Sequence, residues 1–349
     1  MKIQAAGLCL CAFLMGCGSG DAPFGDNGDG DTTGEEGGGG IISDRTIPPG
    51  TTSPQTDDSI FRREPTGGNS GDGFATGVQY NSADDTFTVD NLPFDGGDDT
   101  PYVRGTAVGS LGQYAVYEAV DTYPDSLNGA TITQFRHRAV YGVSRSGNTE
   151  FAIVRTGDYV GYGFGGFVYQ RSGGVTLPTS GQALYNGQGA GLRDYNSRGG
   201  LEYTTSDVQF IIDFDDFNED TGRFEGAVDG FVFNRRVFDI NGNEITSDIL
   251  ARIGEENDAT LTQIPTIRFI ITQNSLDANG EMFGEVFSTF VDNAGDVVNF
   301  EEGNYYAVLS GDDAEELAGV IVVQSTLDPT SPDGVRDTTG FTIYREPFN

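Results

Sequence analysis

Apolar and polar residues alternate in short segments over most of the chain after residue 73. Runs of about six to ten residues rich in Phe, Tyr, Val, Ile and Thr are separated by Gly, Asn and Asp. In one of them Val228, Gly230 and Val232 share a face while Asp229 and Phe231 share the other. A period of two of this kind is typical of β-strands that are buried on one side.

Six candidate strands precede a break at residues 172–174, and eight follow it. The six are 86–92, 102–108, 113–120, 131–143, 150–156 and 162–170, and the eight are 181–191, 201–214, 223–235, 266–274, 282–291, 303–310, 318–325 and 339–345. Eight consecutive strands with mostly short turns fit a closed barrel, which removes exposed sheet edges. The sequence therefore predicts an all-β chain, in which a small antiparallel sheet precedes an eight-stranded up-and-down antiparallel β-barrel. The exception is an insertion at 240–263 with a helix-like stretch, SDILARIGEEN.

Asn-Gly and Asp-Gly pairs mark the expected turns, for example in DINGNEIT, LDANGEMF and VDNAGDVV. These residues tolerate the positive φ that tight turns need. DINGNEIT also invites a calcium-loop interpretation, but Glu244 stands where an EF-hand needs glycine. We favour turns there and assign no metal ligands.

The first residues have the pattern of a secretion signal. After Lys2, residues 3–16 form an apolar run that is too short to span a bilayer but suits a signal-peptide core. The run ends in Leu14-Met15-Gly16-Cys17, which resembles the lipobox of bacterial lipoproteins. We expect cleavage before Cys17 and lipid attachment to its thiol. An ordinary secretion signal with an incidental cysteine is the alternative.

Cysteine usage agrees with a lipid-anchored chain. Cys9 and Cys11 lie in the segment to be removed, so Cys17 would be the one cysteine left, and no disulfide could form within one molecule. Since no acidic residue directly follows Cys17, we expect the outer membrane, and its cell-surface face in preference to its periplasmic face. Residues 18–73 are rich in glycine and acidic residues and are expected to form a disordered tether.

Charge excludes one class of partner. The chain has 19 Lys and Arg against 53 Asp and Glu, a net charge of −34, and Lys2 is its one lysine. Such a surface repels nucleic acid and anionic lipid headgroups. We therefore expect no nucleic-acid partner, and a membrane association that comes from the N-terminal lipid alone.

Several segments resemble the transferrin-binding-protein-B-like family of surface lipoproteins. The resemblance rests on LPTSGQALYNGQGAGL (177–192), YYAVLSGDDAEELAGVIVVQS (305–325) and TGFTIYREP (339–347). Its most specific residues are Gly311, Asp313, Ala314, Glu315, Glu316 and Gly319. It implies a small "handle" sheet before the barrel, in a non-enzymatic binding lobe that sometimes works with an outer-membrane transporter. The expected organisation is then signal peptide 1–17, tether 18–73, handle 74–175 and barrel 176–349.

Residues for catalysis are scarce. His137 is the one histidine, and without a free cysteine or a second lysine the common nucleophile–base pairs cannot be assembled. We therefore expect no enzyme and no cofactor, and we interpret His137 as a packed structural residue. Paired carboxylates are expected by chance in so acidic a chain and do not by themselves indicate a glycosidase.

The handle is the predicted ligand-binding surface. Between residues 74 and 171 there are 11 acidic residues and 6 arginines, the least negative balance in the chain. Arginine and tyrosine are enriched at interface hot spots. The candidate contacts are Arg136, Arg138, Tyr159, Tyr162 and Phe164. The predicted function is binding of a protein or solute ligand, and the alternative is an acidic shielding lipoprotein without a dedicated ligand.

Overall fold

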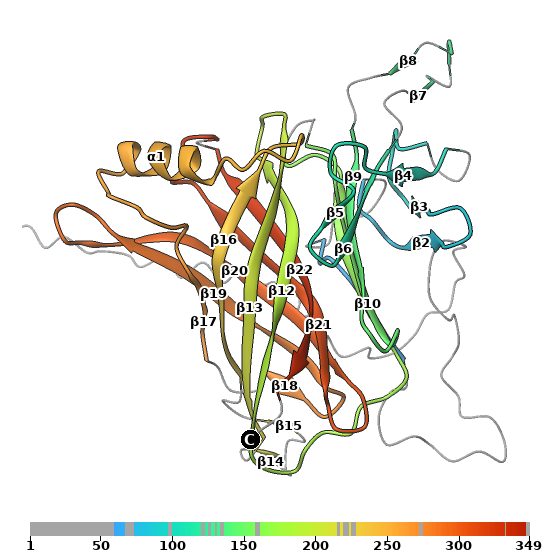
Figure 1. The fold of residues 1–349 in the computed structure, drawn as a ribbon, viewed down its shortest axis with the longest axis vertical. Helices are drawn as coiled ribbons and strands as arrows, with labels where there is room; N and C mark the ends of the chain where they lie inside the picture. The colour runs from blue at the N-terminus through green and yellow to red at the C-terminus, as the bar shows by residue number, and fades with distance from the viewer. Residues whose placement is uncertain are drawn as a thin grey trace, which may run out of the picture.

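Two antiparallel sheets packed against each other make up the protein, a curled handle sheet and a closed barrel (Figure 1). The computed structural model describes residues 59–66, 73–96, 100–119, 123–124, 127–129, 131–132, 136–157, 161–214, 217–218, 223–224, 228–271, 275–331 and 333–346. The fold class predicted from the alternation is confirmed. So is the order of a handle followed by a barrel that the family resemblance implied.

The barrel consists of eight strands in chain order, each antiparallel to its neighbours. They are β12 (Gln182–Tyr195), β13 (Leu201–Asp213), β16 (Val228–Phe238), β17 (Ile267–Phe269), β19 (Glu281–Val291), β20 (Val297–Ser310), β21 (Glu316–Ser325) and β22 (Val335–Arg345). Pairing of β12 with β22 closes the barrel. Three further short strands, β14 (Phe217–Asn218), β15 (Arg223–Phe224) and β18 (Leu276–Asp277), extend the ladder beside β19. Each of the eight predicted strands overlaps one barrel strand, although β17 is much shorter than expected.

The handle is a nine-stranded sheet in the order β1-β11-β10-β9-β6-β4-β3-β2, with β5 paired to β6. Its strands are β1 (Ser59–Arg63), β2 (Val78–Asn81), β3 (Thr86–Val89), β4 (Tyr102–Arg104), β5 (Ser110–Leu111), β6 (Tyr114–Glu118), β9 (Arg138–Val143), β10 (Thr149–Arg155) and β11 (Gly165–Ser172). A separate pair consists of β7 (Tyr123–Pro124) and β8 (Thr131–Ile132).

Strand β1 corrects the predicted extent of the tether. It lies within residues 18–73, where the glycine-rich and acidic composition predicted disorder, yet it pairs along its whole length with β11. The physical reason is local. Ile60 is buried in the apolar cluster between handle and barrel, and Arg62 and Glu64 pair with charges on other strands. The folded part therefore begins at or before residue 59.

An aspartate organises each of three turns in the same way. In the turn before the helix, the Asp239 carboxylate accepts hydrogen bonds from the backbone N–H groups of Asn241 and Asn243. Asp277 and Asp292 do the same for the residues two and four positions further on. These carboxylates are thus used by their own turns, as the turn interpretation of the Asn-Gly segments predicted.

Most of the barrel interior is filled with apolar side chains. Phe210 packs edge-on against Phe269, whose ring stacks on Tyr305 with centroids 4.4 Å apart. Glycines let the wall bend around this core. A Cβ at Gly191 would lie 1.9 Å from the Thr338 carbonyl oxygen of the neighbouring strand, so no side chain fits there.

A charged layer follows this apolar core along the inside of the barrel. The guanidinium of Arg235 donates to both oxygens of Glu301, at 2.6 and 2.8 Å, and lies 3.3 Å from Asp337. Nearby, Arg193 pairs with Glu202 and Asp328. All six side chains are buried, and hydroxyl groups of Thr204, Ser288 and Thr339 donate further hydrogen bonds to the carboxylates.

Helix α1 (Thr246–Glu256) covers the end of the barrel next to this layer (Figure 1). Its buried Ile249 and Ile253 join a small apolar cluster with Val237, Phe290 and Phe300 of the barrel strands. The predicted helix-like segment in the insertion is therefore confirmed. Of the helices in the described part of the chain, none has the length and apolar composition that a membrane crossing requires.

Candidate functional site

The handle packs on one side of the barrel through aromatic rings that sit over glycines. The ring of Phe151 on β10 lies against Gly340 of β22, where a Cβ would come within 2.1 Å of it. Tyr114 donates its hydroxyl hydrogen to the Gln188 carbonyl at 2.5 Å and accepts from the Thr342 N–H at 2.9 Å. This contact fixes the handle against β12, β21 and β22, and it leaves an open seam towards β19 and β20.

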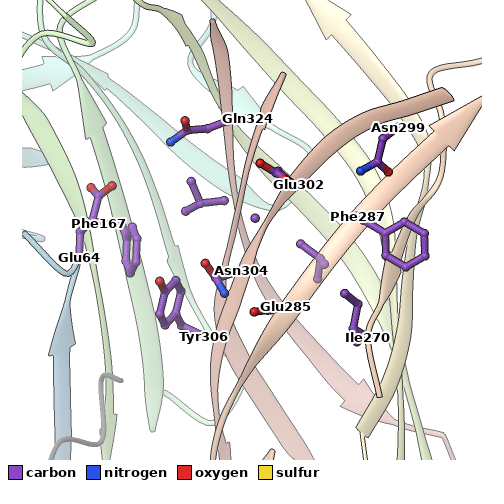
Figure 2. A pocket seen from close by; sticks show the side chains of 13 residues that line it. Glu64, Phe167, Ile270, Glu285, Phe287, Asn299, Glu302, Asn304, Tyr306 and Gln324 are labelled. Atoms are coloured by element: carbon purple, nitrogen blue, oxygen red, sulfur yellow. The ribbon is translucent and has the colours of Figure 1, made fainter. Parts of the chain in front are cut away.

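A cleft of about 710 Å³ occupies that seam. One wall is formed by Glu64 and Phe167 of the handle side, and the other by the outer faces of β19, β20 and β21 (Figure 2). We call it the seam cleft. Its lining residues are Glu64, Phe167, Ile270, Glu285, Val286, Phe287, Asn299, Glu302, Gly303, Asn304, Tyr306, Val322 and Gln324.

The strand register determines how the barrel wall of the seam cleft is composed. Because side chains two apart share a face, the outward residues form rows across the three strands. From the handle outwards the rows are Phe283, Tyr306 and Val320, then Glu285, Asn304 and Val322, then Phe287, Glu302 and Gln324. The wall therefore changes from apolar under the handle to polar and acidic at the open side.

The three carboxylates of the seam cleft are not equivalent. Glu64 accepts hydrogen bonds from Arg155 at 2.8 and 3.2 Å and lies 3.8 Å from Arg336. Burial acts to raise the pKa of Glu64, but the two arginines outweigh it and the pKa is lowered. Glu285 and Glu302 are exposed, and no basic residue of the described chain forms an ion pair with either. Two negative charges are thus presented to an incoming ligand.

A second hollow, of about 340 Å³, adjoins the seam cleft and shares Asn299, Glu302 and Gln324 with it. Tyr162 lies in its lining, and the Arg336 guanidinium carbon stands 4.5 Å from the centre of the Tyr162 ring. Together the two hollows form a groove that follows the boundary between handle and barrel.

The predicted ligand-binding residues are not brought together in one patch. Tyr162 lies at the groove, and Phe164 packs against the handle core. Arg136 is exposed, whereas Arg138 is 7% exposed and its Nε lies 3.5 Å from Glu118 Oε1 on the adjacent strand. Arg136 precedes strand β9, which begins at Arg138. Cys17 and Tyr159 lie outside the described residues.

The residues of the seam cleft were missed in the sequence. Glu285, Glu302 and Asn304 alternate with buried residues along their strands, which is the ordinary pattern of a solvated barrel face. Only the docking of the handle beside them turns this face into a concave surface. The sequence signal that could have indicated the cleft was the presence of acidic residues at outward positions of two consecutive predicted strands.

The side chains of the site can form hydrogen bonds, ion pairs and aromatic contacts. Among the described residues, no three His, Cys, Asp or Glu side chains are grouped so that they could hold a metal ion. His137 is fully buried beside Tyr102, with ring centroids 6.2 Å apart, and burial lowers its pKa to about 3. It is a packed side chain, as the sequence predicted, and lies in the handle rather than in the groove.

Comparison with known proteins gives matches among solved structures. No protein-family model matches the chain, and no curated protein matches it. A transferrin binding protein B variant from Haemophilus parasuis Hp5 is 14% identical, with a TM-score of 0.32 over 68% of this chain, and the chain spans 45% of that protein. A variant from Actinobacillus pleuropneumoniae H49 is 13% identical, with a TM-score of 0.30 over 59% of this chain and 79% of that one. A structure described as a surface lipoprotein is 13% identical, with a TM-score of 0.28 over 77% of this chain and 96% of the other.

Proposed function

We propose that this protein is a non-enzymatic binding lipoprotein of the outer membrane that holds its ligand in the groove between handle and barrel. The observation that carries the proposal is the seam cleft, a concave surface of about 710 Å³ in which aromatic, amide and carboxylate side chains converge. Convergence of a few polar groups over an apolar floor is what ligand sites have in common. The barrel interior offers no comparable space in its described part, since side chains fill it.

Anchoring is the second part of the proposal. Cys17 would carry the lipid, and the residues before β1 would connect it to the handle. An outer-membrane transporter is a further candidate partner, as in the family that the sequence resembles. In cell fractionation, a Cys17→Ser variant should leave the membrane fraction or accumulate as precursor. Unchanged fractionation with the outer membrane would refute the anchor.

The binding proposal can be tested by blocking the groove. A soluble chain that starts at residue 18 has no cysteine, so Asn304→Cys creates a single thiol in the seam cleft. Modified with a bulky maleimide, this variant should lose proteins that the unmodified chain captures from an extract of the cell surroundings. The matched control is Glu256→Cys, modified identically on the exposed end of α1, which should capture as before.

Each other outcome has a definite meaning. If both modified variants capture equally well, the groove is not the binding site, and an Arg136→Glu variant then tests the outer face of the handle. If even the unmodified chain captures nothing above background, the shielding alternative replaces the binding function.

A further inference from the structure

The seam cleft is asymmetric in charge, and this asymmetry restricts its ligand. Its lining contains three carboxylates and no basic residue among the described side chains, and the adjoining hollow adds Asp333. Glu64 is neutralised from behind by Arg155 and Arg336. Glu285 and Glu302 form no ion pair with a basic residue of the described chain, and they lie diagonally across the paired strands β19 and β20. A cation placed between them meets two negative charges, and the exposed Arg268 stands beyond Phe287 in the same outer row, outside the lining of the cleft.

Aromatic side chains provide the second half of the recognition surface. Tyr306 lies between Phe167 of the handle and Phe283 of β19, with ring centroids 5.4 Å apart in both pairs. All of Tyr306, Phe283 and Phe287 remain partly exposed. Lysine and arginine pack their aliphatic stems and charged heads on such rings. Side-chain amides at Asn299, Asn304 and Gln324 can meet the hydrogen-bonding groups of a polypeptide backbone.

Charge also decides between the available occupants. A second copy of this chain carries the same net charge of −34, and residues 18–58 contain nine acidic residues against one arginine, so both are repelled by the groove. The groove consists of two adjoining hollows along the boundary between the sheets. Its length suits an extended segment better than a compact solute.

Resting on the proposed binding function, we propose that the groove recognises a basic, extended polypeptide segment of a partner protein. One lysine or arginine side chain lies on Tyr306 between Glu285 and Glu302, and the backbone of the segment follows β20 towards Tyr162. The field of the acidic protein as a whole attracts such a segment, and the two glutamates hold it in place.

The test uses the soluble chain from residue 18 and an eight-residue peptide that alternates arginine or lysine with serine. Titration calorimetry compares the wild type with Glu285→Gln plus Glu302→Gln. The matched control, Glu255→Gln plus Glu256→Gln, removes the same charge from exposed positions on α1. We expect Kd to rise about tenfold or more for the cleft variant and less than about twofold for the control, since local ion pairs act on dissociation and distant charges mainly on encounter. A version of the peptide with glutamate in place of each basic residue should not bind.

Three results would overturn the inference. If both double variants bind the peptide equally weakly, the binding is explained by the overall negative charge of the protein and not by the two glutamates of the cleft. If the acidic peptide binds as tightly as the basic one, charge does not contribute to recognition in the groove. If spermidine displaces the peptide at the same concentration as the peptide itself, the groove binds small polycations rather than a polypeptide. Failure of the proposed function looks different, because then the maleimide on Asn304→Cys leaves protein capture intact.

Discussion

Two regions of the barrel interior are filled in opposite ways by the same strands. In one, Phe210, Phe269 and Tyr305 contact each other through their rings within a cluster of buried apolar side chains. In the other, Arg235 and Arg193 are surrounded by carboxylates and hydroxyl groups. The first region stabilises the fold by removing apolar surface from water. In the second region the attraction between the charges is offset by the free energy needed to remove them from water. Its ion pairs therefore contribute more to the specificity of the fold than to its stability.

The charged layer is also not neutral. Two arginines, Arg193 and Arg235, face the four carboxylates of Glu202, Glu301, Asp328 and Asp337. Burial raises the pKa of Asp337, and Glu301 adds to this while Arg235 opposes it. For Asp328, burial acts in the same direction, but Arg193 outweighs it and the pKa is lowered. An acidic group in this layer thus depends on its own arginine, whereas the apolar core has no such pairwise dependence.

Removing one arginine should therefore have the largest effect. Arg235→Met leaves Glu301 and Asp337 buried without their cation, and we expect the free energy of unfolding to fall by about 3–5 kcal/mol at pH 8. The loss should shrink towards pH 5, because the unpaired carboxylates then take up protons. Urea unfolding measures both. The control is Arg236→Met, whose side chain is 61% exposed, with an expected change below about 1 kcal/mol. Equal losses in the two variants would contradict the distinction.

A smaller effect is expected from Asp337 of the charged layer, which makes the stability of the protein depend on pH. A raised pKa of Asp337 means that the folded protein binds this proton more readily than the unfolded chain does. The stability contributed by Asp337 is therefore highest at acid pH and is lost as the pH rises from about its ordinary value of 3.8 through the raised value. Asp337→Asn cannot titrate, so unfolding measured from pH 4 to pH 8 should show a shallower decline than in the wild type, by at most about 1.4 kcal/mol per pH unit. An unchanged slope would place the origin of the decline elsewhere.

The smallest effect is expected in the apolar core. Ile212→Val removes one methylene from a fully buried side chain, and should cost about 0.5–1.5 kcal/mol. The described cluster around Ile212 contains no acidic, basic or histidine side chain, and burial raises the pKa of its Tyr185 and Tyr305 above the ordinary value, so the loss should be the same at pH 5 and pH 8. A pH-dependent loss in urea unfolding would show that the two regions are coupled.

The alternation of residues predicted the barrel but not its charged layer. Reading a strict period of two along β16 places Val228 and Val232 inside, and would place Asn234 inside after them. The structure has a bulge there, with Asn234 at a φ of 51°, and the pairing with β13 shifts between Thr205 and Asp207. One extra residue reverses the faces, so Arg235 points inward. A bulge is a local event that no period reveals.

The groove between handle and barrel could not be predicted from the sequence for a different reason. The prediction for the handle rested on residue types, and those types are used inside the fold: Arg138 and Arg155 are buried with glutamates, and Phe164 packs on the handle core. The chain has few arginines and many carboxylates, so several of its arginines pair with buried carboxylates inside the fold and are not free to contact a ligand at the surface. Of the predicted residues, Tyr162 lies in the lining of the smaller hollow.

Strand β1 has a mechanical consequence for a chain held from its amino-terminal side. It is paired over five residues with β11, and its Arg62 also donates to Glu281 of the barrel at 2.6 Å. Hydrogen bonds of an antiparallel pair lie across the strand, so tension along β1 loads them together rather than one after another. The bond to Glu281 carries part of the same tension into the barrel. Tension applied from the amino-terminal side of β1 is thus shared by both sheets, through the β1–β11 pairing and the Arg62–Glu281 bond.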